Sequence, residues 1–352
     1  YKHIQIMIKY TQLGSSDLMV SNICMGTMTF GQQNSQQEAH QQLDYAMGQG
    51  INFIDTAEMY PVPPRENTAY STEIIVGNWV KSKPRDKIIL ATKAAGSSRG
   101  MPWVRDGEHA FNSTNLNNAV EGSLKRLQTD YIDLYQLHWP ERNTPMFGQY
   151  LFDPVHEREF TAFVETLEAL SGLVKEGKIR HIGLSNEWPW GLMQFLNASE
   201  REGLPRVVSM QNAYNLINRT YDFSMREMGY RENVPLLAYS PMAFGHLSAK
   251  YINDPKAQGR VNIFDGFAQR YEKPSVGSAI KAYSNLAEEL STTTATLALA
   301  FTYSRWFCAS TIIGASNMDQ LKENIEAVNF EWNEKIEQAI EAVHLKFFNP
   351  AP

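Results

Sequence analysis

The sequence has few cysteines, no long apolar run and no excess of positive charge, and each absence excludes a class of protein. Cys24 and Cys308 are the only cysteines in 352 residues, which excludes a disulfide framework and favours a reducing compartment. No apolar run is long enough to span a bilayer. A formal net charge of −6, without runs of lysine or arginine, argues against a nucleic-acid surface. No cluster of metal ligands is evident, so we expect no metal site.

The N-terminal segment, YKHIQIMIKY, lacks the long apolar stretch of a signal peptide. We therefore expect a cytoplasmic protein with no membrane partner. The chain starts at Tyr1 rather than at a methionine, so Met7 is a candidate natural start, with residues 1–6 as an upstream extension.

Eight short apolar runs recur along the chain and show little alternation, as is typical of buried parallel strands. They lie at residues 22–27, 51–55, 87–93, 131–138, 179–186, 207–211, 234–239 and 310–316. Helical patterns separate them, most clearly at residues 37–50, 71–82, 113–128, 159–178 and 190–203. Strand alternating with helix eight times predicts an α/β protein, either a closed (β/α)8 TIM barrel or a long doubly wound sheet.

No linker, repeat or shift in composition marks a second domain, so we expect one domain over residues 1–352. Residues 8–21 predict an N-terminal β-hairpin that turns at Gly14 to Asp17, residues 22–328 the barrel, and residues 329–352 a C-terminal helix and tail. Three connections, at residues 94–113, 139–159 and 240–275, are longer than a barrel needs, and long βα loops are usually functional. Their aromatic residues either line a substrate pocket or pack the loops; these are Trp103, Phe147, Tyr150 and Phe152.

Polar residues end seven of the eight apolar runs. Read along the chain, the last residues of the runs are Asp55, Lys93, His138, Ser185 with Asn186, Gln211, Tyr239 with Ser240, and then Gly314. Taken singly, Asp55 fits a turn residue, Lys93 a solvated strand end and His138 a core histidine. In a barrel, however, these positions converge at one rim, where barrel enzymes build their active sites.

Tyr60, five residues after Asp55, completes a group that could deliver a proton. A lysine cation lowers the pKa of a neighbouring tyrosine from its usual value of about 10. An aspartate beside the lysine keeps it charged and in position, and a histidine can hydrogen-bond a substrate oxygen. Such a group can protonate a carbonyl oxygen, an effect worth roughly 10²–10⁴ in rate.

Several stretches together resemble the aldo-keto reductase family over nearly the whole chain. They include LGSSDLMVSNICMGTMTFG, GINFIDTAEMY, SLKRLQTDYIDLYQLHWP, GKIRHIGLSN, QNAYNLINR, LLAYSPMAFGHLSAKY and IIGASNMDQLKENIEAV, in the family's order and spacing. The long loops are most similar to the bacterial Tas-type members, which are related to potassium-channel beta subunits. The resemblance implies the barrel rather than the doubly wound sheet.

The resemblance implies that Asp55, Tyr60, Lys93 and His138 form a catalytic tetrad with Tyr60 as general acid. It also implies an NADPH (NADP+) cofactor extended across the barrel mouth. The residues that match the family's cofactor positions are Gly26, Thr27, Met28, Asp55, Ser185, Asn186, Gln211, Tyr239, Ser240, Pro241, Met242, Ala243, Lys250, Arg260, Gly314, Ser316, Gln320, Glu323 and Asn324.

The expected activity is NADPH-dependent reduction of aldehydes or ketones to alcohols by hydride transfer, with a small carbonyl compound as substrate. A homo-oligomer is compatible with this family. The alternative is a cofactor-sensing regulatory module with little turnover, similar to the channel beta subunits. A third hypothesis, a Schiff-base enzyme using Lys93, fits the tyrosine, histidine and amides poorly.

The chain departs from the family pattern at two places. Pro61 follows the tyrosine where many members have glycine. Gly314, Ala315 and Gln320 stand where short-looped members bind the 2′-phosphate with a Lys-Ser pair and an arginine.

Overall fold

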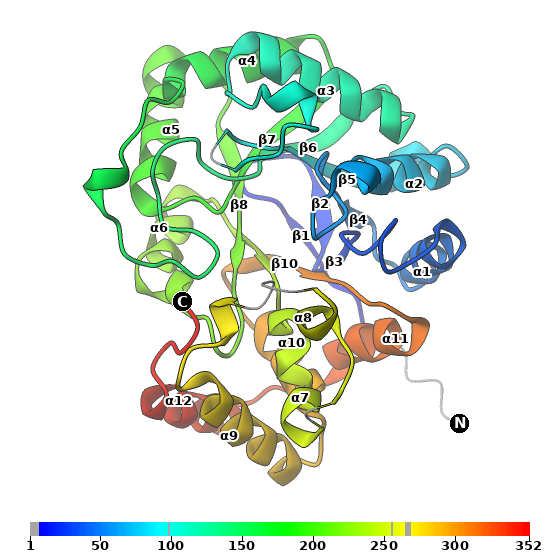
Figure 1. Cartoon of the computed structure of the whole chain (residues 1–352), viewed down its shortest axis with the longest axis vertical. Helices are drawn as coiled ribbons and strands as arrows, with labels where there is room; N and C mark the ends of the chain where they lie inside the picture. The colour runs from blue at the N-terminus through cyan, green and yellow to red at the C-terminus, as the bar shows by residue number, and fades with distance from the viewer. Residues whose placement is uncertain (1–6, 98, 255, 265–268) are drawn as a thin grey trace.

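A computed structural model describes residues 7–97, 99–254, 256–264 and 269–352. Eight parallel strands form a closed barrel in the order β10-β3-β4-β5-β6-β7-β8-β9 (Figure 1). Their bounds are β3 Ile23–Gly26, β4 Phe53–Asp55, β5 Ile89–Ala94, β6 Ile132–Leu137, β7 Ile179–Ser185, β8 Val207–Ala213, β9 Leu236–Tyr239 and β10 Cys308–Ile313. The barrel is confirmed and the doubly wound sheet is excluded, because β10 pairs with β3 and closes the ring.

Helices surround the barrel and cover the outward faces of its strands (Figure 1). The five predicted helices are present, with ends shifted by four residues or fewer. In the described residues the helices are α1 Gln36–Gly48, α2 Ser71–Val80, α3 Ser113–Leu127, α4 Phe163–Lys175, α5 Pro189–Glu202, α6 Met225–Glu232, α7 Lys250–Asn253, α8 Arg260–Ile263, α9 Val276–Glu289, α10 Thr294–Tyr303, α11 Met318–Glu326 and α12 Glu334–Lys346. None of them is long and apolar enough to cross a bilayer.

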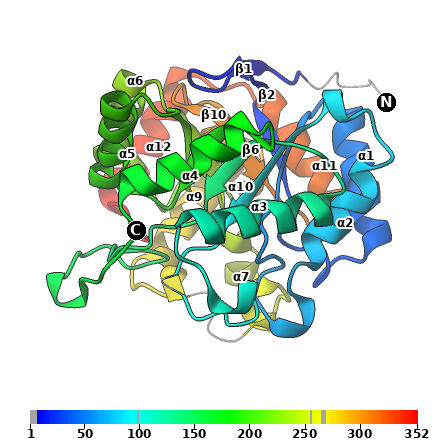
Figure 2. The same ribbon diagram turned by 90° about the horizontal axis from the view of Figure 1, so that it is seen from above.

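The predicted hairpin is also confirmed, as β1 Tyr10–Gln12 and β2 Met19–Ser21. Figure 2 shows it at one end of the barrel, with α7 at the opposite end. Gly14 has φ +56°, and a Cβ there would lie 2.3 Å from the carbonyl oxygen of Val208, so only glycine fits this turn. Leu13 and Leu18 are buried against interior residues of the barrel and close the end at which its strands begin.

Alternate residues of each strand point into the barrel and form layers. The layer near the N-terminal ends of the strands is apolar, and the next layer is polar. Phe53 and Leu134 belong to the apolar cluster, together with Leu13 and Leu18 of the hairpin. Two residues further along the same strands lie Asp55 and Gln136, which are buried and polar. The polar layer therefore lies toward the C-terminal ends of the strands, which is the end where barrel enzymes carry their sites.

The three long connections include short helical segments. The connection after β9 contains a 3-10 helix at Ala243–Ser248 and the two short helices α7 and α8. The connection after β6 contains a 3-10 helix at Pro154–His156. Short helices satisfy backbone groups that a structureless loop would leave to solvent.

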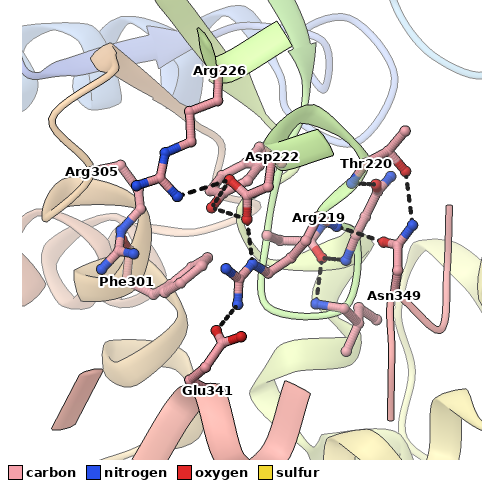
Figure 3. Close-up of polar contacts among 12 residues, drawn as sticks. Arg219, Thr220, Asp222, Arg226, Phe301, Arg305, Glu341 and Asn349 are labelled. Atoms are coloured by element: carbon pink, nitrogen blue, oxygen red, sulfur yellow. Dashed lines mark hydrogen bonds and ion pairs between the residues drawn. The ribbon is translucent and has the colours of Figure 1, made fainter. Parts of the chain in front are cut away.

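Arg219 joins the C-terminal segment to the connection after β8 (Figure 3). Its side chain contacts Asp222 at 2.6 Å and Glu341 of α12 at 3.1 Å. Its backbone N–H donates to Asn349 Oδ1 at 2.7 Å. These contacts hold α12 and the tail against the barrel.

Candidate active site

Lys93 lies at the centre of the polar layer and is fully buried. It is the next-to-last residue of β5, near the C-terminal end of the strand. Its Nζ lies 2.5 Å from Asp55 Oδ2, 2.8 Å from the Thr56 carbonyl oxygen and 3.3 Å from the Tyr60 hydroxyl. An ammonium has three donors, so all of them are used. Burial lowers the pKa of Lys93, but Asp55 and Tyr60 outweigh that effect and raise it overall. The amine is therefore held as a cation, which disfavours a role as a Schiff-base nucleophile.

Asp55 accepts hydrogen bonds on both carboxylate oxygens. Oδ2 faces Lys93, while Oδ1 accepts from Gln136 Nε2 at 3.0 Å and Gln211 Nε2 at 2.8 Å. A Cβ at position 183 would lie 3.1 Å from Gln136 Cγ and 2.7 Å from Ser209 Oγ, so Gly183 leaves room for this layer. Full hydrogen bonding makes burial of the ion pair tolerable and fixes the direction of the lysine.

Tyr60 is carried over this layer by the connection after β4. Its N–H donates to Ala57 O at 3.1 Å, and two residues later the Val62 N–H donates to Met28 O at 3.0 Å. In the same connection Glu58 is fully buried and contacts Arg105 at 3.0 Å. These contacts place the phenol beside Lys93.

The pKa of Tyr60 is raised overall, contrary to the expectation that the lysine lowers it. Burial is the largest cause; Lys93 lowers the pKa, as predicted, but Asp55 opposes it. The phenol is therefore protonated at neutral pH. A protonated phenol next to a fixed cation is suited to giving up its proton only when an oxygen near it gains negative charge.

His138 follows β6 and packs edge-on against Tyr60, with ring centroids 5.6 Å apart. Burial, and then the cations of Lys93 and Arg99, hold the pKa of His138 well below its usual value. The ring is therefore neutral at pH 7. Its Nδ1 is buried and finds no hydrogen-bond partner among the described residues, while other atoms of His138 line the cavity.

A cavity of about 1950 Å³ opens above these residues at the C-terminal end of the barrel. Pockets for drug-sized ligands measure roughly 300–1,000 Å³, so there is room for a dinucleotide and a substrate together. The predicted site residues that line it are Gly26, Thr27, Met28, Asp55, Tyr60, His138, Ser185, Asn186, Gln211, Tyr239, Ser240, Pro241, Met242, Lys250, Gly314, Ser316, Gln320, Glu323 and Asn324.

On one side of the cavity, amides and hydroxyls from three strand ends form a connected row. Asn186 Nδ2 donates to His138 O at 2.9 Å and to Ser185 Oγ at 3.2 Å, and Asn186 Oδ1 accepts from the Tyr239 hydroxyl at 2.6 Å. Gln211 Nε2 continues the row to Asp55. Such a row holds donors and acceptors in fixed directions for a planar amide, and the ring of Tyr239 borders the same space.

The far end of the cavity lies at the N-terminus of α11. Asn317 caps this helix, and Gln320 Oε1 accepts from the Ser316 N–H and hydroxyl at 3.0 and 2.9 Å. Asn324 Nδ2 donates to Gly314 O at 3.1 Å, and Glu323 accepts from Thr293. A helix N-terminus favours anionic groups such as phosphates. One cavity thus runs from the buried tetrad to a phosphate-compatible helix end.

Some predicted residues lie elsewhere. Lys93 is beneath the cavity floor rather than on its surface, and Ala243 is buried without lining the cavity. Arg260 begins α8, but its side chain lies outside the described residues. Of the four loop aromatics, Phe147 lines the cavity, whereas Trp103, Tyr150 and Phe152 are absent from its lining.

Comparison with known proteins identifies the family of the chain. The aldo/keto reductase family model matches residues 22–344. The chain belongs to the aldo/keto reductase family. It is 44% identical to "Protein tas" of Escherichia coli over 346 residues, covering 98% of this chain and 100% of that protein.

Other relatives extend the same likeness. The chain is 37% identical to an "Aldo-keto reductase" of Babesia bovis, over 75% of this chain and 98% of that protein. It is 30% identical to the "Uncharacterized oxidoreductase YrpG" of Bacillus subtilis, over 94% of each. Family membership assigns the chain to the oxidoreductases, and this family generally uses nicotinamide cofactors.

Sequence reasoning about this aldo/keto reductase missed Gln136 and Glu58. Gln136 bonds both Asp55 and Gln211, and its signal was an amide two residues before His138, on the same face of the strand. Glu58 accepts from the Ala95 N–H at 2.7 Å as well as from Arg105, and nothing in the local sequence distinguishes it from a surface acid.

Proposed function

We propose that the protein is an NADPH-dependent reductase of aldehydes and ketones in which Tyr60 is the general acid. The observation that carries this proposal is the contact of fully buried Lys93 with both Asp55 and Tyr60 beneath the cavity. When bound, a reduced nicotinamide supplies a hydride equivalent to a carbonyl carbon. The row of Ser185, Asn186 and Gln211 would hold its carboxamide beside the Tyr239 ring, and the α11 N-terminus would face its adenosine phosphate.

In this mechanism the residues of the chain deliver one proton to the carbonyl oxygen. The neutral His138 ring orients the carbonyl oxygen toward Tyr60, and Tyr60 transfers its phenolic proton to that oxygen as negative charge develops there. Lys93, 3.3 Å from the hydroxyl, stabilises the phenolate that remains, and Asp55 holds Lys93 in place. Each role is an electrostatic effect strengthened by burial.

The choice of NADPH over NADH rests on likeness to the long-looped branch of the family. Gln320 is engaged with Ser316, and the same end of the cavity carries the Glu323 carboxylate. Binding titrations with NADPH and NADH test this choice directly. An equal or tighter affinity for NADH would contradict it.

The first prediction concerns Tyr60→Phe, which removes the hydroxyl and keeps the ring. With 4-nitrobenzaldehyde and NADPH, we expect kcat to fall by about 10²–10⁴ while the affinity for NADPH is kept. Tyr230→Phe is the matched control, because Tyr230 is 71% exposed on α6 and should leave the rate unchanged. An unchanged rate in Tyr60→Phe would refute the mechanism. Tight NADPH binding without turnover on a broad carbonyl panel would favour a cofactor-sensing module instead.

A further inference from the structure

Two arginines on the cavity wall have no carboxylate partner in the part of the chain that the structure describes. Arg99, from the connection after β5, and Arg270, from the connection after β9, both line the cavity. Arg99 is exposed, but Arg270 is only 9% exposed, and its Nε has no hydrogen-bond partner among the described residues. Burying a guanidinium without a counter-charge is costly, and since no described residue supplies one to Arg270, the cavity beside it suits an anionic ligand.

The other buried arginines show what the chain does when the charge is structural. Arg142 lies against Glu187 with a closest contact of 2.5 Å, and Arg219 contacts Asp222 and Glu341. The polar neighbours of Arg270 are instead the phenols of Tyr239 and Tyr271. Phenols are uncharged at neutral pH and cannot balance a guanidinium.

The two arginines approach the same part of the cavity. The Arg99 guanidinium lies 4.5 Å from the centre of the Phe147 ring and 5.7 Å from that of Trp139. The Arg270 side chain lies against the Tyr239 and Tyr271 hydroxyls, and Tyr239 is also an electrostatic neighbour of Arg99. Both cations therefore lie near Tyr239 on the cavity wall. Trp139 in turn packs on His138, with ring centroids 4.5 Å apart, so this place adjoins the proposed site of carbonyl chemistry rather than the α11 end.

We propose that Arg99 and Arg270 bind an anionic group of the substrate, so that the preferred substrates are aldehydes or ketones carrying a carboxylate or a phosphate. Guanidinium groups bind both anions through paired hydrogen bonds, and the aromatic wall formed by Phe147 and Trp139 accommodates the apolar part of the molecule. This inference rests on the proposed reductase function and adds the class of substrate.

The test compares matched substrates in the full-length protein with NADPH. One pair is 4-carboxybenzaldehyde and methyl 4-formylbenzoate; the other is glyceraldehyde 3-phosphate and glyceraldehyde. We expect kcat/KM to favour the anionic member of at least one pair by about 10- to 100-fold, and this ratio to fall toward one in Arg99→Met and Arg270→Met. The pair that shows the preference identifies carboxylate or phosphate. Because the ratio is taken within a pair, a general loss of activity cancels.

Two further variants complete the design. Arg231→Met changes an exposed arginine on α6 that pairs with Glu227 and should keep the wild-type ratio. Arg99→Lys should restore part of the preference, since it keeps the charge. Because Arg99 is exposed, we expect Arg99→Met to fold like the wild type, so the test stands even if Arg270→Met folds poorly.

Three outcomes would overturn the inference. One is a wild-type protein that shows no preference for either anionic substrate. Another is an anionic preference that survives in both variants. The third is weaker NADPH binding in Arg270→Met with an unchanged substrate ratio, which would assign the cation to a cofactor phosphate. Failure of the reductase proposal itself is distinct, because then no substrate of either pair is turned over, or Tyr60→Phe turns over the neutral substrates at the wild-type rate.

Discussion

Arg219 and Arg270 are both buried beside aromatic rings, yet their electrostatic surroundings are opposite. Arg219 contacts two carboxylates, from Asp222 and Glu341, and its guanidinium lies 5.3 Å from the centre of the Phe301 ring (Figure 3). Arg270 lines a large cavity, and its polar neighbours among the described residues are the phenols of Tyr239 and Tyr271. A cation surrounded by its own anions stabilises the fold, whereas a buried cation facing a cavity without one is poised to bind a ligand.

Replacing Arg219 should have the largest effect on this comparison. Arg219→Met leaves Asp222 and Glu341 without their shared cation, and breaking a buried ion pair costs about 3–5 kcal/mol. We expect the free energy of unfolding, measured by urea denaturation, to fall by that amount. Replacing Arg226, which is 4.0 Å from Asp222 and more exposed, is the control and should cost far less. Equal losses in the two variants would mean that Arg219 is no better paired than a surface residue.

The same change at position 270 should act in the opposite direction. Arg270→Met removes a buried charge that has no counter-ion among the described residues, so we expect the free energy of unfolding without ligand to rise by about 1–2 kcal/mol. Urea denaturation next to Arg219→Met makes the comparison direct. If Arg270→Met is destabilised as strongly as Arg219→Met, then Arg270 is a structural residue and the contrast between the two fails.

His246 gives the smallest expected effect, because a histidine can escape an unfavourable charge by losing its proton. Burial, and then the Lys250 cation, lower the pKa of His246 to about 4. The imidazole packs against the rings of Tyr251 and Tyr271. The unfolded chain takes up this proton near pH 6.5, so between about pH 6.5 and 4 the unfolded state binds more protons and stability falls as the pH falls.

The matching experiment compares wild type with His246→Gln at pH 7 and pH 5. Allowing for partial exposure of the ring, we expect wild type to lose about 1 kcal/mol more than the variant over this range. Urea midpoints at the two pH values provide the measurement. Parallel losses would show that His246 is protonated as readily in the folded protein as in the unfolded chain.

Much of the fold could be predicted because its signals are local. The apolar runs, the helical patterns and the turn at Gly14 each depend on neighbouring residues. The tetrad positions could be named because Asp55, Lys93 and His138 end or follow successive strands, and parallel strands bring such ends together. The pKa of Tyr60 could not be predicted, since its direction depends on how deeply the phenol is buried beside Lys93.

The sequence by itself determined the alternation of strands and helices, the hairpin and the set of polar residues at the strand ends, because hydrophobic periodicity and turn chemistry act over a few residues. Only the tertiary structure decided that Gln136 supports Asp55, and that Arg270 lies buried with no anion among the described residues while Arg219 has two. The physical reason is that hydrogen bonds, ion pairs and desolvation depend on distances between residues far apart in the chain. Among 32 lysines and arginines, spacing along the sequence does not tell which cation will be left facing a cavity.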